Sequence, residues 1–160
     1  MNTKLYLDTS IPSAFYDSSK PVRQLMTQKW FEFDRTNYQL FVSTLTIQEV
    51  ERFQNIEKRN QIIDLIVRSN CELLEITSEA VELSEIYLKN GAIPKSEPED
   101  ALHIAIATIA QIESLASWNF KHIVSVNPIR KIHELNQKNG FGIIEIGSLE
   151  LFGGYKYGNL

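Results

Sequence analysis

The chain has 160 residues, of which 43% are hydrophobic and 22% are charged, a composition typical of a globular protein with one substantial core. Its formal net charge of −4 argues against broad nonspecific binding of nucleic acid through a basic face. The charge does not exclude a nucleic-acid enzyme, because a carboxylate metal site adds negative charge that its cations neutralise. The single cysteine excludes an internal disulfide framework and a cysteine-based zinc site.

No apolar run approaches the roughly 20 residues that span a bilayer. The N-terminal MNTKLYLDTS lacks the apolar core and cleavage site of a signal peptide, and Asp8 falls where that core should be. We therefore expect a cytoplasmic protein that does not enter a membrane. We also expect a single domain over residues 1–152 and a flexible C-terminal tail over 153–160, whose closing sequence GGYKYGNL is small and polar.

The first part of the chain predicts a strand, a helix and a second strand. KLYLDTS begins as a strand that ends at Asp8, and Thr9–Pro12 then form a turn towards a helix. Apolar residues recur at helical spacing from Pro21 to Asp34. LFVST, at residues 40–44, is apolar and β-branched, which predicts a buried strand.

Three helices and a third strand follow. TIQEVERF predicts a helix with Thr46 as its N-cap and Glu49 three residues later, the pattern of a capping box. IIDLIVR predicts another helix, and CELLEI predicts a strand. A further helix starts at Thr77 or Ser78 and ends at Asn90-Gly91, since glycine commonly follows a helix end.

The last third begins with the most apolar helix of the chain. In KSEPEDALHIAIATIAQI, Ser96 is a suitable N-cap, Pro98 lies in the first turn and Glu99 completes a second capping box. This helix is apolar almost all round, so we expect it to be buried against a sheet. SLASW predicts a strand, NPIRKIHELNQKNG a helix and GIIEI a last strand. Short apolar strands that alternate with helices indicate an α/β fold, a three-layer α/β/α arrangement with a central parallel sheet.

Oxygen-bearing side chains occur where the predicted strands end and the helices start. Asp8 ends the first strand, and Asn119 follows the fourth. Glu49 and Asp100 lie in the first turns of two helices. Ligands of such folds bind beyond the carboxyl ends of the strands, so we expect strands one and four to be neighbours and these side chains to meet. Because hard divalent cations relieve repulsion between carboxylates, the set predicts a Mg²⁺ or Mn²⁺ site suited to phosphodiester hydrolysis.

Each of these residues also has an ordinary structural explanation. Asp8 is a typical turn residue at a strand end, Glu49 fits a capping box, and Asp100 suits a helix N-terminus through the dipole. We expect Glu99 to act mainly as a helix cap. His103, one turn beyond Asp100, is more typical of a hydrogen-bonded core histidine than of a metal ligand. Only the joint pattern points to a site.

Taken together, LDTS, a Glu in the second predicted helix, EDALHIAIA and SWNFKHI resemble the PIN-domain family of metal-dependent ribonucleases, over about residues 6–152. The resemblance implies a parallel sheet with flanking helices and a Mg²⁺ or Mn²⁺ site. It implies that Asp8, Glu49 and Asp100 bind the metal and that Thr9 supports them. Many members place a fourth acid where this chain has Asn119, whose carbonyl oxygen can still bind a metal or orient water but brings no charge.

Small prokaryotic PIN proteins include the VapC-like toxins of toxin–antitoxin pairs, which cleave RNA and are held silent by an antitoxin. The resemblance therefore implies an RNA substrate, an antitoxin protein as partner, and a homodimer through the helices at 21–34 and 57–69. Basic residues also follow the fourth strand, and they either grip RNA phosphates or are solvated helix charges: Lys121, His122, Arg130 and Lys131.

Other functions stay open at this point. A PIN-like module with weak catalysis, acting through a protein or RNA partner, is the main alternative, because the fourth acid is missing and the net charge is negative. Haloacid-dehalogenase-like phosphatases place a second Asp two residues after the first, where this chain has Ser10. Response-regulator receivers need an acid pair that TKLYLD does not supply.

Overall fold

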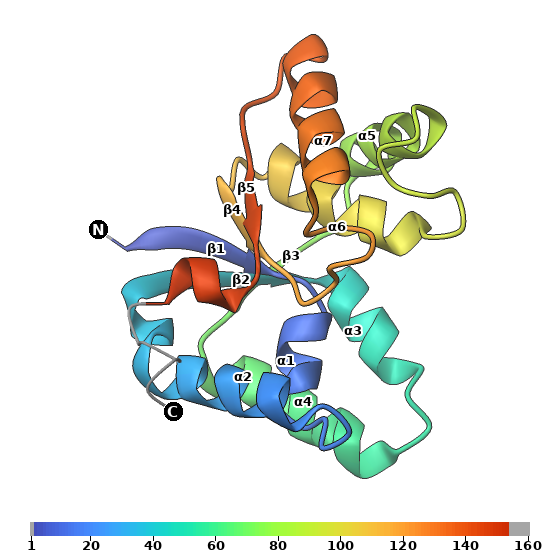
Figure 1. The fold of residues 1–160 in the computed structure, drawn as a ribbon. Coiled ribbons are helices and arrows are strands. Elements are labelled where there is room, and N and C mark those ends of the chain that lie inside the picture. Colours follow the sequence, from blue (N-terminus) through green and yellow to red (C-terminus); the bar gives the residue numbers. More distant parts are fainter. Residues whose placement is uncertain (1, 154–160) are drawn as a thin grey trace.

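The computed structural model describes residues 2–153. They form three layers, a central five-stranded sheet with helices on each of its two faces (Figure 1). The strands are β1 (Thr3–Leu7), β2 (Tyr38–Ser43), β3 (Glu72–Leu74), β4 (Ser114–Ala116) and β5 (Glu145–Gly147). Their order in the sheet is β3-β2-β1-β4-β5, and every pairing is parallel. The predicted three-layer α/β/α class is confirmed, and so is the prediction that strands one and four are neighbours.

Helices cover both faces of the sheet. The described residues form α1 (Ser10–Ala14), α2 (Pro21–Phe33), α3 (Thr44–Glu51), α4 (Ile56–Arg68), α5 (Ser78–Lys89), α6 (Pro98–Ile109) and α7 (Val126–Lys138), with 3₁₀ turns η1 (Arg35–Asn37) and η2 (Leu149–Phe152). In Figure 1, α5, α6 and α7 lie above the sheet, and α1, α2 and α4 lie below it. The helices expected over residues 21–34 and 62–67 are α2 and α4.

The strands divide their side chains between two apolar clusters. Leu5 and Leu7 pack in the cluster that contains Trp30 of α2, whereas Tyr6 packs in the cluster that contains Ile104 of α6. Successive residues of a strand point to opposite faces, so a strand buried on both faces must be apolar at every position. This is why the strands appear in the sequence as continuous apolar runs.

Helix α6 is buried along almost its whole length, as predicted. Ala101, Ala105 and Ala107 are completely inaccessible to solvent. Side chains of one methyl group let this helix approach its neighbours closely. The N-terminal end of the helix, where Asp100 lies, is more exposed than its middle.

The two predicted capping boxes do not form. Helix α3 begins at Thr44, directly after β2, with Ser43 at the N-cap, so Thr46 lies inside the helix. Helix α6 has Glu97 at its N-cap, and neither N-cap side chain makes a capping hydrogen bond. In α6 the first helical residue is Pro98, whose fixed φ starts the helix and which has no N–H to be capped.

The turn expected at Thr9–Pro12 is instead the start of α1, which begins at Ser10. Pro12 is tolerated there because the first N–H groups of a helix have no intrahelical partner. The predicted start and end of α5 are confirmed. The Thr77 side chain accepts a hydrogen bond from the Ala80 N–H at 3.1 Å, and Gly91 after the helix has a φ of 74°.

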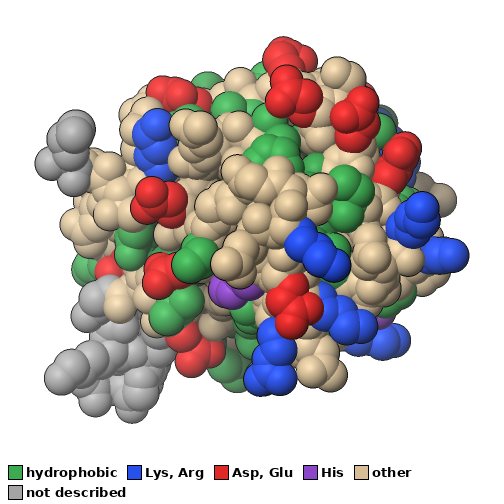
Figure 2. All heavy atoms as spheres, turned by 90° about the horizontal axis from the view of Figure 1, so that it is seen from above, with side chains coloured by type: hydrophobic (Ala, Val, Ile, Leu, Met, Phe, Trp, Pro, Cys, Tyr) green, Lys and Arg blue, Asp and Glu red, His purple; other side chains and the backbone are tan. Residues whose placement is uncertain are grey.

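In the described part of the chain, no helix has both the length and the apolar character needed to cross a membrane. Apart from Gly153, the predicted tail lies outside the described residues. Figure 2 shows the face above α5, α6 and α7, where Lys and Arg gather towards one side with an acidic side chain among them. This face as a whole is not basic, in keeping with the net charge.

Candidate functional site

The candidate site lies where the strand order of the sheet reverses. The chain places β2 on one side of β1 and, later, β4 on the other. Such a switch point leaves a crevice beyond the carboxyl ends of the strands. The backbone N–H of Asp8, just after β1, donates to the carbonyl of Ala116 at the end of β4 at 3.2 Å. The two strands therefore deliver the residues that follow them to one place.

The Asp8 carboxylate is only 4% exposed and is held by short hydroxyl side chains. The backbone N–H of Ser10 donates to Asp8 Oδ1 at 3.0 Å, and the Ser10 hydroxyl donates to the same oxygen. Ser10 Oγ in turn accepts from the backbone N–H of Trp118 at 2.9 Å. Burial raises the pKa of Asp8, against the opposing charge of His103 and hydrogen bonds from Ser10 and Ser117.

Glu49 lies in the last turn of α3, not in the first as expected, because the helix starts immediately after β2. The Thr9 hydroxyl donates to Glu49 Oε1 at 3.0 Å, and His103 Nε2 lies 2.5 Å from the same oxygen. Burial alone would raise the pKa of Glu49, but the hydrogen bond and charge of His103 and the bond from Thr9 outweigh it and lower the pKa. Glu49 is therefore an ionised carboxylate with partners inside the protein.

His103 is 2% exposed and lies at the centre of a hydrogen-bonded chain. Its Nδ1 is 2.7 Å from the Tyr6 hydroxyl, which is 2.8 Å from Ser43 Oγ. When Nε2–H donates to Glu49, a neutral ring leaves Nδ1 free to accept from Tyr6. Burial lowers the pKa of His103, but the hydrogen bond and charge of Glu49 outweigh this effect and raise it. His103 is thus a hydrogen-bonded buried histidine, as the sequence predicted.

Asp100 lies in the first turn of α6, as predicted, and is joined to the loop after β4. Asn119 Nδ2 donates to Asp100 Oδ2 at 3.0 Å, while Asn119 Oδ1 accepts from the backbone N–H of His122 at 2.9 Å. Burial, together with the charges of Asp8 and Glu97, raises the pKa of Asp100 to about 6. Asp8 and Asp100 are therefore close enough for their charges to interact.

Glu99 is not a helix cap, and this part of the expectation is wrong. Arg52 Nη2 donates to Glu99 Oε1 at 2.5 Å, so the pair joins the end of α3 to the start of α6. Both side chains are exposed, and such ion pairs contribute little to stability.

The donor set suits a hard divalent cation in part. Asp8 and Asp100 are carboxylates whose mutual repulsion a divalent cation would relieve. Glu49 is instead directed to His103 and Thr9. Among residues 2–153, no three His, Cys, Asp or Glu side chains stand together as a metal-binding group. Of the three predicted ligands, Asp8 and Asp100 could therefore hold a metal directly, whereas Glu49 is engaged by His103 and Thr9.

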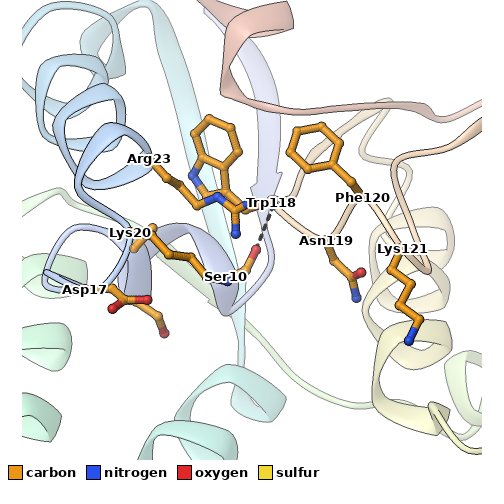
Figure 3. Close-up of a pocket in the computed structure, with 10 residues that line it drawn as sticks. Ser10, Asp17, Lys20, Arg23, Trp118, Asn119, Phe120 and Lys121 are labelled. Carbon is orange, nitrogen blue, oxygen red and sulfur yellow. Dashed lines mark hydrogen bonds between the residues drawn. The ribbon is translucent and has the colours of Figure 1, made fainter.

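A pocket of about 460 Å³ opens beside the acids and has Ser10 and Asn119 in its wall (Figure 3). Of the basic residues noted after the fourth strand, Lys121 lines this pocket. His122 pairs with Glu97 at 3.6 Å, and Lys131 donates to the Gly91 carbonyl at 3.4 Å.

Sequence reasoning missed several residues that hold the acids or His103. Tyr6 is a polar group inside an aliphatic strand, and a buried tyrosine hydroxyl usually needs a partner. Ser10, two residues after Asp8, fits the local turn in which an Asp side chain binds the backbone ahead of it. Ser117 gave no signal beyond its place after the fourth strand.

The model of the PIN domain family matches residues 5–119. One similar solved structure is that of VapBC2 from Rickettsia felis bound to a DNA fragment from their promoter, with 17% identity and a TM-score of 0.55 over 90% of this chain and 98% of that chain. Another is that of Mycobacterium tuberculosis VapC20, a sarcin-ricin loop cleaving toxin, with 12% identity and a TM-score of 0.56 over 74% of this chain and 92% of that chain. No curated protein matches the chain. At these identities the two likenesses show the fold.

Proposed function

Because the chain belongs to the PIN-domain family, we propose that it is a Mg²⁺- or Mn²⁺-dependent endoribonuclease and the toxin of a toxin–antitoxin pair. The observation that carries this proposal is the arrangement at the switch point of the sheet. Asp8 follows β1 beside the end of β4, and Asn119, in the loop after β4, donates to Asp100. A metal bound by these two acids would supply an activated water and balance charge on the scissile phosphate.

The residues around the two acids orient them for this task. Ser10 fixes the Asp8 carboxylate, and the Asn119 amide fixes that of Asp100. Asn119 uses both ends of its side chain in hydrogen bonds within the protein, so its role is to position Asp100. The ionised Glu49, which is hydrogen-bonded to His103, adds a third negative charge near the carboxyl ends of the strands.

Cleavage of a fluorescent single-stranded RNA by the purified protein tests the proposal. We expect cleavage with Mg²⁺ or Mn²⁺ and none with EDTA. Asp100→Asn should lower the rate at least about a hundredfold while the protein stays folded, because it keeps the shape and removes the charge. Asp64→Asn, an exposed change on α4, is the matched control and should cleave like wild type. A fully active Asp100→Asn protein would show that the acid is only a helix-terminal residue.

The alternative function is that of a catalytically weak PIN-like binding module. It is favoured by the hydrogen bond that turns Glu49 to His103 and by the uncharged Asn119. Under that alternative, the wild-type protein binds RNA or a protein partner but does not cleave RNA at any concentration of Mn²⁺.

The proposed partners follow from the same family membership. The likeness to VapBC2 and to VapC20 supports an antitoxin protein as partner and RNA as substrate. A homodimer through α2 and α4 is supported by the apolar side chains that these helices expose. The largest exposures are those of Val22 (72%), Ile56 (65%) and Val67 (67%).

A further inference from the structure

The pocket beside Asn119 differs in charge from the acids next to it. Its charged lining residues are the cations Lys20, Arg23 and Lys121 and the anion Asp17, which gives a local balance of +2, three minus one, in a chain with a net charge of −4. We call it the Phe120 pocket, after the aromatic residue in its wall. In Figure 3, Asp17 lies beside Lys20, whereas Lys121 lies on the far side of Asn119.

One wall of the Phe120 pocket is a fixed aromatic and cationic platform. The Arg23 guanidinium lies 5.3 Å from the Trp118 ring centre and 5.7 Å from that of Phe120. Trp118 is buried, and its Nε1–H donates to Thr27 Oγ1 at 2.9 Å, so this ring is held in place. Phe120, in contrast, is 47% exposed. The platform therefore presents an open aromatic face backed by a planar cation.

The Phe120 pocket shares its wall with the acid site. Asn119 stands between Trp118 and Phe120 in the chain and donates to Asp100. Ser10, also in the wall, donates to Asp8. A ligand in the pocket would therefore lie next to any phosphate held at the acids. The Ser13 hydroxyl, also in the lining, has no hydrogen-bond partner among the described residues.

Resting on the proposed function, we propose that the Phe120 pocket holds one nucleotide of single-stranded RNA next to the scissile phosphate. Its base stacks on Phe120 beside Arg23, and its phosphate lies at Lys121, away from Asp17. Proteins bind single strands by combining aromatic faces, Arg and basic residues in this way. The volume of about 460 Å³ falls in the usual range of small-ligand sites, about 300–1,000 Å³.

Stacking on Phe120 also determines which bases the Phe120 pocket accepts. Every base has a flat face, so stacking on Phe120 tolerates all four bases. We therefore expect weak base preference at this position. Lys20, at the edge next to Asp17, should contribute less to phosphate binding than Lys121, because the Asp17 carboxylate opposes a phosphate there.

Binding of a fluorescein-labelled eight-nucleotide RNA in EDTA, followed by fluorescence anisotropy, tests the pocket without cleavage. Phe120→Leu keeps an apolar side chain but removes the stacking face, and should raise Kd about fivefold or more. Lys121→Gln should reduce the slope of log Kd against log salt concentration by about 0.7, the loss of one phosphate contact. Phe33→Leu is the matched control, since Phe33 is 48% exposed with Lys29 5.5 Å from its ring, but lies outside the pocket.

Cleavage kinetics separate this inference from the proposed function. Phe120→Leu should raise KM several-fold and leave kcat within about twofold, because stacking holds the substrate beside the reacting phosphate. Cleavage with the same KM and the same Kd in Phe120→Leu and wild type would overturn the pocket and leave the ribonuclease standing. RNA binding that needs Phe120 in a protein that never cleaves would overturn the ribonuclease and leave the pocket. RNA binding indifferent to Phe120 and Lys121, with binding of a protein partner sensitive to both, would assign the pocket to a protein and overturn the proposal.

Discussion

The raised pKa of Asp100 couples proton binding to folding and, under the proposed function, to metal binding. Its ordinary pKa of 3.8 is raised to about 6 by burial and by the charges of Asp8 and Glu97. Because the folded state binds this proton more tightly than the unfolded state, the group contributes stability below pH 3.8, and the contribution is lost as the pH rises through about 6. A divalent cation binds the ionised form, so its effect has the opposite pH dependence.

We predict that the rise in Tm on adding Mn²⁺ grows as the pH increases from about 5 to 7.5, while the metal-free protein loses stability over the same range. A ligand at a hundredfold excess over its Kd stabilises the native state by about 2.7 kcal/mol. Thermal unfolding of wild type and Asp100→Asn, with and without Mn²⁺, measures both trends. In Asp100→Asn, the loss of stability with rising pH should be smaller than in wild type, and Mn²⁺ should raise Tm by less. A wild-type Mn²⁺ shift of equal size at both ends of the range would contradict this coupling.

Asn119 offers a second test with a single residue. Asn119→Asp keeps an oxygen for the His122 N–H but replaces the amide donor to Asp100 with a charge that repels it. The metal-free variant should therefore be less stable than wild type by about 1–3 kcal/mol at neutral pH. With Mn²⁺ its stability should recover, and its cleavage rate should match or exceed that of wild type. Chemical denaturation with and without Mn²⁺ measures this, and a variant that the metal fails to rescue would argue against a metal beside Asp100.

At the scale of elements, the bonds around His103 join four segments of the fold. Tyr6 comes from β1, Ser43 from the end of β2, Glu49 from α3 and His103 itself from α6. Buried polar groups of this kind are costly when one partner is removed, because the others are left unsatisfied. The network therefore ties the sheet to the two helices that carry acids.

We predict that His103→Ala lowers the free energy of unfolding by about 1–3 kcal/mol, because it removes one hydrogen-bond partner from the buried Tyr6 hydroxyl and one from the Glu49 carboxylate. Its effect on cleavage should be smaller, less than about tenfold, since His103 contacts neither Asp8 nor Asp100 through a hydrogen bond in the described structure. Urea unfolding and initial cleavage rates measure the two effects. His133 lies on α7, and His133→Ala removes its one bond to the Ile144 carbonyl and serves as the control. A stable but inactive His103→Ala protein would instead make this residue part of the chemistry.

For the whole molecule, exposed apolar side chains on α2 and α4 lead to a prediction about assembly. Leu25 on α2 is 42% exposed, and Val67 on α4 is 67% exposed. A charge at an apolar interface is costly, so Leu25→Glu should convert the proposed dimer to a monomer. Light scattering at micromolar concentration measures the change. Ile143→Glu, at a 73% exposed position before β5, is the control and should stay dimeric. A wild-type monomer in the same measurement would remove the dimer from the proposal.

The order of the elements and the positions of Asp8 and Asp100 follow from local sequence patterns. A strand buried on both faces must be apolar at each position, and a buried helix must be apolar around its circumference, so β1, β2 and α6 were visible as local patterns. Asp8 at a strand end and Asp100 in a first helical turn follow from the same patterns. Their meeting was predictable because the carboxyl ends of parallel strands share one edge.

The contacts of each side chain in the site depend instead on how distant segments fold together. Tyr6 and His103 are 97 residues apart, and nothing near either one in the sequence specifies their hydrogen bond. The hydrogen bond of Glu49 with His103 and the ion pair of Glu99 with Arg52 likewise depend on where the fold places α3 relative to the N-terminal half of α6. Hydrophobic periods of 2.0 residues in strands and 3.6 residues in helices report which face of an element is buried. Hydrogen bonds and pKa shifts arise instead from atoms a few ångströms apart on different elements, which these periods do not encode.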